Sequence, residues 1–358
     1  MARRTANGSR RRLETSRAQP VTLRTLADYL GLSPATISIV INRAPAAKSI
    51  PHRTHERILA AARRLNYRPN TLARSLQRRR SFTVGVLVPE ISEGYSATVM
   101  GGIEDYLLQE GYLYFVASHR HRADLIAEYP RLLLDRAVEG LIAVDTPGVH
   151  NLPVPVVAVS GHDRAKGVTN IELNHARAAR LALEHLASLG HRRLAVIKGQ
   201  EFSSDTETRW RSIHAASKAL CLPIHPRLVV QLQGDLPSPE LGYRVTVDLL
   251  ARREPFTALF AFNDIAAIGA IRALREAGLN VPEDVSVVGF DDVQSAAYQQ
   301  PALTTVRQPL REMGELAAQT LLARLARPSA GSSDTSIRVE PVLVVRGSSG
   351  PAPIQPSL

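Results

Sequence analysis

Apolar residues recur every three or four positions along residues 23–30, a spacing that predicts a short amphipathic helix. Thr22 stands where this helix needs a cap, and Gly31 ends it. A second helix is predicted over residues 34–42, with Ser33 as its cap and a proline at its first position. Two short helices joined through a glycine are typical of a helix-turn-helix unit.

A third helix follows a loop that runs from Arg43 to Arg53. Its inner face is predicted to carry four apolar residues, Ile58, Leu59, Ala62 and Leu65. Three helices of this kind can close one compact core. We therefore expect a small all-α helix-turn-helix domain over residues 21–68.

From Phe82 the pattern changes to short apolar runs that alternate with amphipathic segments of helix length. The runs are residues 84–88, 113–117, 141–144, 156–159, 194–197, 228–230, 258–261 and 285–289. This alternation predicts parallel sheets, and residues 82–346 are long enough for two of them. We expect an α/β domain of two Rossmann-like lobes, with a ligand cleft beyond the carboxyl ends of the strands. A linker over residues 69–81 would precede it, and a flexible tail over residues 347–358 would follow.

Net charge divides the chain into two unequal parts. The 358 residues together carry +11, but residues 1–80 hold 18 Lys and Arg and three acids, a balance of +15, and the remainder carries −4. A basic module beside a near-neutral domain is the electrostatic signature of a protein that neutralises DNA phosphates and releases their counterions. The alternative is a solvated charged face, which a weaker excess would fit better.

Residues 1–20 are basic but have no apolar stretch behind them, which indicates a disordered arm and not a signal peptide. No apolar run approaches the ~18 residues that span a bilayer, so we expect no membrane partner. The lone Cys221 cannot form an intramolecular disulfide. This favours a reducing compartment, and we expect the thiol to be buried. We expect a cytoplasmic location, at the nucleoid.

Candidate catalytic chemistry is sparse. The sequence has no serine elbow, phosphate loop or dinucleotide glycine pattern in the context that each one needs. Four histidines lack the spacing of metal ligands and are expected in surface or capping roles: His119, His121, His185 and His191. We therefore expect no catalytic site, no metal and no cofactor.

The helical domain carries, in register, a set of residues that is typical of one family. The matching segments are 22–23, 26–27, 31–33, 35–38, Asn42, 65–70 and 72–76. On these residues the chain resembles the LacI/GalR family of bacterial transcription regulators, whose second helix lies in the major groove of operator DNA.

The resemblance implies DNA contacts for twelve residues. Those near base edges would be Pro34, Ala35, Ser38 and Ile39. Those at phosphates would be Ser33, Thr36, Asn42 and Tyr67. The expected interface also includes Thr22, Asn70 and Ala73. Leu76, on a hinge helix that pairs in a homodimer, would wedge into the minor groove, and the alternative is a flexible basic linker.

Two features depart from the family pattern. Ile39 stands where an arginine often reads guanine, so contact with a thymine methyl group is the expected substitute. The alternatives are a helix residue packed into the core, or a domain that no longer binds DNA. The loop from Arg43 to Arg53 is also longer than the common family loop, which should change the approach to the third helix.

The α/β domain resembles the effector domain of the same family, which is related to periplasmic sugar-binding proteins. The marker segments are 189–192, 242–243, 263–264, 267–269, 278–279, 281–286, 289–292 and 301–306. The resemblance implies effector contacts from Tyr95, Ser96, Asp205, Arg209, Leu236, Asn263 and Asp291. A sugar or sugar derivative is the leading ligand, because amide and charge-assisted hydrogen bonds can satisfy several hydroxyl groups.

Some positions near this expected site allow more than one role. Asp205 either bonds a ligand hydroxyl or caps its helix, and Asp264 is expected to cap or support the helix after it. Leu236 stands where a stacking aromatic is frequent. Leu173 replaces a common acidic contact, which neighbouring Glu172 could supply.

These observations predict a homodimeric, sequence-specific regulator, most often a repressor in this family, whose affinity for operator DNA depends on a small effector. A solute-binding protein would need a signal peptide and no basic domain. An enzyme acting on sugars would need an acid–base pair in the cleft, for which Asp291 and Asp264 are the only candidates. The segment from Arg338 is expected to form one strand and a tail, so we expect no helical tetramerisation segment.

Overall fold

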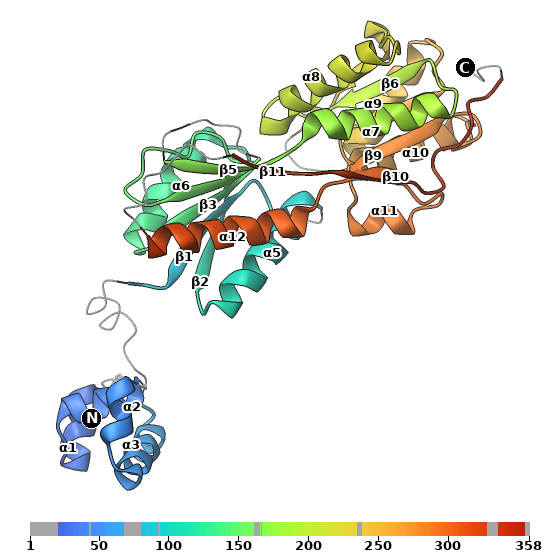
Figure 1. Ribbon diagram of the computed structural model, residues 1–358. Helices are drawn as coiled ribbons and strands as arrows, with labels where there is room; N and C mark the ends of the chain where they lie inside the picture. The colour runs from blue at the N-terminus through green and yellow to red at the C-terminus, as the bar shows by residue number, and fades with distance from the viewer. Residues whose placement is uncertain are drawn as a thin grey trace, which may run out of the picture. The chain divides into compact units, whose positions relative to one another are not determined.

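The computed structural model describes residues 21–42, 44–67, 80–91, 94–160, 165, 167–234, 238–327 and 336–354. The chain divides into two compact units, residues 1–80 and residues 81–358, which we call the head and the body. Figure 1 draws the helices and strands of both units.

The head contains three α-helices and a 3-10 turn in the long loop. They are α1 (Leu23–Leu30), α2 (Pro34–Ile41), η1 (Pro45–Ser49) and α3 (His52–Arg64). The predicted caps are present, since the hydroxyl group of Thr22 accepts from the Thr25 N–H and that of Ser33 from the Thr36 N–H, each at 3.1 Å. Gly31 ends α1 in the left-handed conformation that favours glycine, with φ of 63°.

Six buried residues form the core of the head. They are Leu26, Ala27, Ile37, Val40, Ile58 and Ala61. The prediction that Leu59 faces this core is wrong, because its side chain is 38% exposed. The inner stripe of α3 runs through residues 58, 61, 62 and 65, which is the spacing of one helix face, and residue 59 lies off that stripe.

The body contains two six-stranded sheets, one in each of two lobes. The strands of the first lobe are β1 (Thr83–Val88), β2 (Leu113–Ser118), β3 (Gly140–Val144), β4 (Val156–Val159), β5 (Val168–Leu173) and β11 (Ser336–Val339). Those of the second lobe are β6 (Leu194–Lys198), β7 (Val229–Gln231), β8 (Ala258–Ala261), β9 (Ser286–Asp291), β10 (Thr304–Arg307) and β12 (Val342–Val344). The predicted two-lobed α/β fold is confirmed.

The chain crosses between the two sheets more than once, as the order of the strands shows. The first sheet has the order β11-β5-β4-β3-β1-β2 and is parallel throughout. The second has the order β12-β10-β9-β8-β6-β7, in which β12 runs antiparallel to β10 and the other neighbours are parallel. The expectation of one strand after Arg338 is wrong, because β11 and β12 belong to different sheets and the chain crosses between the lobes there.

Helices cover the faces of both sheets (Figure 1). In the first lobe they are α5 (Tyr95–Gln109), α6 (Ala123–Asp135) and α12 (Leu310–Ala326). In the second lobe they are α7 (His175–Ser188), α8 (Ser204–Ala219), η2 (Pro226–Leu228), α9 (Pro239–Ala251), α10 (Asp264–Glu276) and α11 (Gln294–Tyr298). Along the described parts of the chain, no helix is both long and apolar enough to cross a membrane.

Close contact between α5 and α12 depends on glycine. A Cβ atom added to Gly102 would lie 1.9 Å from the carbonyl oxygen of Arg311, and one added to Gly314 would lie 2.0 Å from that of Val99. Real atoms do not approach this closely, so the two backbones can pack only where both helices lack a side chain.

The segment after β12 packs on the second lobe, so the prediction of a flexible tail from residue 347 is wrong. Ser348 is fully buried, and its hydroxyl group donates to the carbonyl oxygen of Val287 at 2.6 Å. Four residues on, the N–H of Ala352 donates to the carbonyl oxygen of Leu189 at 2.8 Å. The segment is held because it satisfies polar groups of β9 and of the loop after α7. Residues 355–358 lie outside the described part.

Three predictions about Cys and His side chains are also wrong. Cys221 is exposed, in the turn after α8. His191 is buried and hydrogen-bonds the hydroxyl groups of Thr257 and Ser286, each at 2.9 Å, and His119 is buried against Thr146 at 2.8 Å. Burial lowers the pKa of His119 to about 4 and that of His191 below its usual value, so both rings are neutral hydrogen-bonding groups of the core.

Candidate functional site

A cleft with about 600 Å³ of empty space lies at the carboxyl ends of the strands of both lobes. Its described lining consists of Pro89, Glu90, Tyr95, Ser96, His121, Asp145, Gln200, Phe202, Ser203, Asp205, Arg209, Phe262, Asn263 and Asp291. Six of the seven residues expected to contact an effector belong to it. The seventh, Leu236, lies outside the described residues. The cleft therefore gathers side chains from segments up to about 200 positions apart in the sequence.

Arg209, on α8, is held by two aromatic rings and two hydrogen bonds. Its side chain is buried, and its guanidinium lies between two aromatic rings, 4.2 Å from the centre of Phe262 and 3.7 Å from that of Phe290. One terminal nitrogen donates to the carbonyl oxygen of Phe262, and the other to Asp205 Oδ2 at 3.1 Å. Stacking between rings and two hydrogen bonds hold the group in one orientation.

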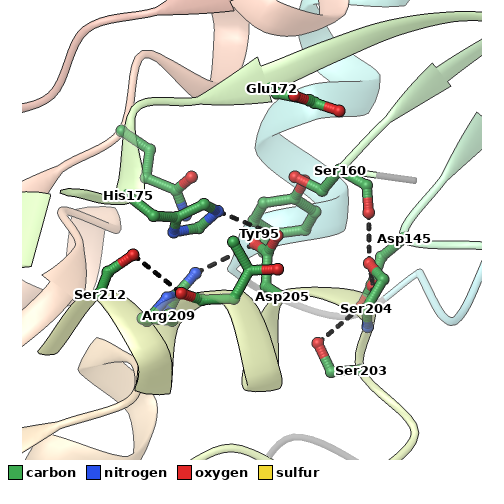
Figure 2. Close-up of polar contacts among 12 residues, drawn as sticks. Tyr95, Asp145, Ser160, Glu172, His175, Ser203, Ser204, Asp205, Arg209 and Ser212 are labelled. Atoms are coloured by element: carbon green, nitrogen blue, oxygen red, sulfur yellow. Dashed lines mark hydrogen bonds and ion pairs between the residues drawn. The ribbon is translucent and has the colours of Figure 1, made fainter. Parts of the chain in front are cut away.

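Asp205 joins Arg209 to a histidine that sequence reasoning missed. Figure 2 shows dashed contacts that join Asp205 to both His175 and Arg209. Asp205 Oδ1 lies 3.2 Å from His175 Nε2. His175 and Asp205 are both buried. The capping alternative for Asp205 is wrong, because α8 begins at Ser204 and both carboxylate oxygens of Asp205 face His175 and Arg209.

Asp145 connects the two lobes across the cleft. It follows β3 in the first lobe, and its carboxylate accepts from the backbone N–H of Ser204 at 3.1 Å and from the hydroxyl group of Ser204 at 2.6 Å, both at the start of α8 in the second lobe (Figure 2). A weaker bond of 3.4 Å comes from Ser203. Burial, and next the negative charge of Asp205, raise the pKa of Asp145 to about 7.

Asp291 ends β9 and lies beside the residue where the chain leaves the second lobe. Gln308, at the crossover into α12, donates its amide N–H to Asp291 Oδ1 at 2.6 Å. Burial raises the pKa of Asp291 to about 7, although the charge of Arg209 opposes the shift. Gln308 was not predicted.

Asn263, and not Asp264, caps the helix that follows β8. Asn263 caps α10, since its side-chain oxygen accepts from the Ala266 N–H at 2.8 Å, and it also lines the cleft. Asp264 does not cap the helix. It is fully buried and accepts from the Val293 N–H at 2.8 Å and the Thr305 hydroxyl group at 2.5 Å, so it supports the segment after β9 and the strand β10.

Aromatic groups line the outer part of the cleft. The rings of His121, from the first lobe, and Phe202, from the second, stack with their centres 3.8 Å apart. The Tyr95 hydroxyl group donates to Ser160 Oγ at 2.8 Å, and burial, followed by the charge of Asp205, raises the pKa of Tyr95 well above its usual value. Ser96 is buried beside it.

Leu173 and Glu172 do not belong to the described lining of the cleft. Leu173 is buried in the core at the end of β5, and Glu172 accepts a hydrogen bond from the Ser336 hydroxyl group at 2.9 Å. Its carboxylate bonds the neighbouring strand β11, and whether Glu172 also replaces the acidic contact stays open.

The exposed face of α2 carries the residues expected at DNA base edges. Pro34 and Ala35 are exposed, and Ser38 and Ile39 are half-buried. Ile39 does not belong to the core cluster of the head, unlike Ile37 and Val40. Ser38 Oγ accepts from the Asn42 side chain at 3.0 Å.

The residues expected at phosphates lie at the ends of the same helices. Thr22, Ser33 and Thr36 lie in the first turns of α1 and α2, and Tyr67 is half-buried after α3. Asn70, Ala73 and Leu76 lie outside the described residues. Over the described residues, no three His, Cys, Asp or Glu side chains are grouped as they would be around a metal ion.

Two family models match the chain, one in each unit. Residues 22–70 match the model for bacterial regulatory proteins of the lacI family. Residues 183–349 match the model for a periplasmic binding protein-like domain. The two matches fall on the helix-turn-helix unit and on the part of the body that contains the second lobe.

Similar proteins cover almost the whole length. The HTH-type transcriptional repressor PurR of Haemophilus influenzae is 30% identical over 337 residues, which is 91% of this chain and 98% of that protein. Among solved structures, the lac repressor dimer bound to operator and the anti-inducer ONPF is 27% identical with a TM-score of 0.81, over 93% of this chain and all of the other. The transcriptional regulator CelR in complex with cellobiose is 28% identical with a TM-score of 0.67, over 91% and 99%. With its helix-turn-helix head, its two-lobed body and these relatives, the chain belongs to the LacI family of bacterial regulatory proteins.

Proposed function

We propose that the protein is a homodimeric, cytoplasmic repressor of transcription that binds operator DNA through the head and responds to a sugar or sugar derivative in the cleft. One observation carries this proposal. An exposed helix-turn-helix face lies in the basic unit of the chain, and the body holds a cleft in which charged, amide and aromatic groups converge around Arg209. The lac repressor and the CelR–cellobiose complex support the two halves of the proposal by analogy.

Within the head, Pro34, Ala35, Ser38 and Ile39 contact base edges in this proposal. The proposed phosphate contacts come from Ser33, Thr36, Asn42 and Tyr67. Thr22, Asn70 and Ala73 complete the proposed interface, and Leu76 is the proposed minor-groove wedge. Since the Ile39 side chain cannot donate a hydrogen bond, in this proposal it contacts a thymine methyl group, and that apolar contact is what distinguishes the base pair.

Within the cleft, the proposed effector contacts are Tyr95, Ser96, Asp205, Arg209, Leu236, Asn263 and Asp291. Asn263 has an amide N–H₂ that its capping bond does not use, and Asp291 has a second oxygen beyond the one that Gln308 bonds. Such groups can bond hydroxyls that point into the cleft. The acids already have structural partners, so we propose binding and no catalysis.

Binding would reach the DNA through linkage. A ligand that prefers one spacing of the lobes shifts the population of the body, and operator affinity changes by the coupling free energy, typically about 1–3 kcal/mol. Both signs, release from DNA or corepression, are compatible with this scheme.

The test is binding of the purified full-length protein to the DNA upstream of its own gene, measured by mobility shift across a salt series and with a panel of sugars. We expect specific, salt-sensitive binding that one sugar changes. Ile39→Ala should weaken specific binding by about tenfold, as expected for a lost base contact, and Leu59→Ala, an exposed apolar residue on α3, should not. Asp291→Ala should retain operator binding and lose the response to the sugar. Absence of specific binding under every condition would refute the proposal.

A further inference from the structure

The cleft carries an excess of negative charge. Among the lining residues that the structure describes, four are carboxylic acids and one is an arginine or lysine. The acids are Glu90, Asp145, Asp205 and Asp291, and the base is Arg209. The charge of the lining is thus opposite to the charge expected of a site that binds phosphate or carboxylate groups.

The charge of Arg209 is already matched inside the protein. Its two terminal nitrogens bond Asp205 and the carbonyl oxygen of Phe262, and the faces of its guanidinium are covered by aromatic rings. An anionic ligand that took the terminal nitrogen now paired with Asp205 would have to displace that carboxylate, and Arg209 Nε, which is buried, has no hydrogen-bond partner among the described residues. Asp205 is itself held from the other side by His175 at 3.2 Å, so displacement would break two contacts of a buried carboxylate.

Two further carboxylates surround this pair. Asp145 and Asp291 are each held by donors, Ser204 for the first and Gln308 for the second, and burial raises the pKa of both to about 7. A ligand phosphate would enter a region in which like charges already disfavour ionisation. Hydroxyl groups, by contrast, can donate to carboxylate oxygens without adding charge.

We propose that the cleft selects its effector by charge: it takes uncharged polyhydroxylated molecules and excludes their phosphate esters and carboxylic acids, and Asp205 sets this selectivity by neutralising Arg209. The inference rests on the proposed effector role of the cleft and narrows it. Asp205 acts on specificity through Arg209, because removal of its charge leaves the guanidinium free to bind an anion.

The experiment is calorimetric titration of the full-length protein with matched sets: glucose, glucose 6-phosphate and gluconate, and the corresponding galactose and ribose sets. A neutral sugar that binds should do so at least about 100-fold more tightly than its phosphate or acid. Asp205→Asn keeps a side-chain oxygen for Arg209 and should raise affinity for the anionic members at least about tenfold. The matched control is Glu207→Gln, an exposed residue two positions along α8 that changes net charge equally and should leave the ratio unchanged.

Each outcome bears on the proposal. It is overturned if the wild-type protein binds a phosphate ester or an acid as tightly as the parent sugar, a comparison that needs no variant. It is also overturned if the two variants change anion affinity equally, since bulk charge would then explain the effect, or if no member of any set binds. Operator binding measured in parallel separates the two proposals. If a sugar phosphate releases operator DNA, the proposed function stands and charge selection is refuted. If neutral sugars bind more tightly than their anions but no operator binding is found, charge selection stands and the proposed function is refuted.

Discussion

Replacement of Arg209 by methionine should destabilise the body by about 3–5 kcal/mol, the usual cost of breaking a buried ion pair from one side. The pair joins Arg209 NH2 to Asp205 Oδ2 at 3.1 Å, with side chains 4% and 6% exposed. The change leaves Asp205 with His175 as its described partner and removes the stacked contacts to Phe262 and Phe290. For a domain of this size, each kcal/mol lowers Tm by about 2–4 °C, so a decrease of roughly 6–20 °C is expected.

The assay is urea unfolding followed by the fluorescence of Trp210, the single tryptophan of the chain, which lies on α8 beside Arg209 and therefore reports on the body. The double variant Asp205→Asn/Arg209→Met should recover about 1–3 kcal/mol relative to the sum of the single changes, because no unpaired charge then stays buried. The control is Arg211→Met, whose side chain is 70% exposed and pairs with Glu207 at 3.5 Å, with an expected change below about 0.5 kcal/mol. A loss below about 1 kcal/mol for Arg209→Met, or strict additivity in the double variant, would refute the reasoning.

Three further predictions test the packing of α5 against α12, the hydrogen bonds of Asp145 to Ser204 between the lobes, and the titration of the cleft carboxyl groups. Gly102→Ala should destabilise the body by about 1–3 kcal/mol, because its Cβ would meet backbone at 1.9 Å, whereas Gly101→Ala meets the flexible end of Arg311 at 2.8 Å and should be neutral; thermal unfolding compares the two. Asp145→Ala should speed hydrogen exchange of the Ser204 N–H at least about tenfold, as expected for a lost charged hydrogen bond, and exposed Asp135→Ala should leave it unchanged. The free energy of unfolding should fall as pH rises from about 6.5 to 8. The reason is that folded Asp145 and Asp291, with pKa values of about 7, still hold protons that the same groups of the unfolded chain, with pKa near 3.8, have lost. Asp291→Asn should make the fall of unfolding free energy with pH less steep, and an unchanged steepness in the variant would contradict this prediction. The lowered pKa of His119, about 4, acts in the opposite direction, mainly below pH 6.5.

Much of the architecture could be predicted, because the helices and strands follow from the spacing of apolar residues along the chain. Each predicted apolar run coincides or overlaps with a strand, and the polar residues Asn263, after β8, and Asp291, at the end of β9, fall in the cleft because parallel strands end at the same edge of a sheet. The caps at Thr22 and Ser33 could be predicted for a similar reason, since the signal lies within four residues of sequence.

The missed residues depend on where the chain changes lobes. His175 follows β5 directly and Gln308 follows β10, two strands that the sequence pattern did not reveal. Without those strands nothing in the sequence indicates that the two residues lie beside Asp205 and Asp291. The roles of Asn263 and Asp264 could not be separated either, because adjacent residues both suit a helix start and only the position of Thr305 draws the aspartate inward.

Predictions from neighbouring residues were also wrong where a contact with a distant part of the chain determines the environment of a side chain. Gly190 and His191 fit a helix end, and the backbone N–H of His191 does donate to the carbonyl oxygen of Leu186, but the imidazole bonds Thr257, just before β8, and Ser286, at the start of β9. The serine- and glycine-rich segment from residue 347 has the composition of a loop, yet its buried hydroxyl group completes the hydrogen bonds of β9. Composition describes what a segment can do alone and not which partner it meets.

The arrangement of the cleft also explains how a ligand could change the spacing of the lobes. The first turns of α8 carry Asp205 and Arg209, and the same turns carry the Ser204 that Asp145 of the first lobe holds. A molecule that bonds Asp205 or Arg209 therefore acts on α8, the helix whose first residue, Ser204, is hydrogen-bonded to Asp145 of the first lobe. Ligand contact and lobe contact share one rigid element, so they cannot vary independently, and a ligand that fits only one position of α8 must favour the lobe spacing that goes with it.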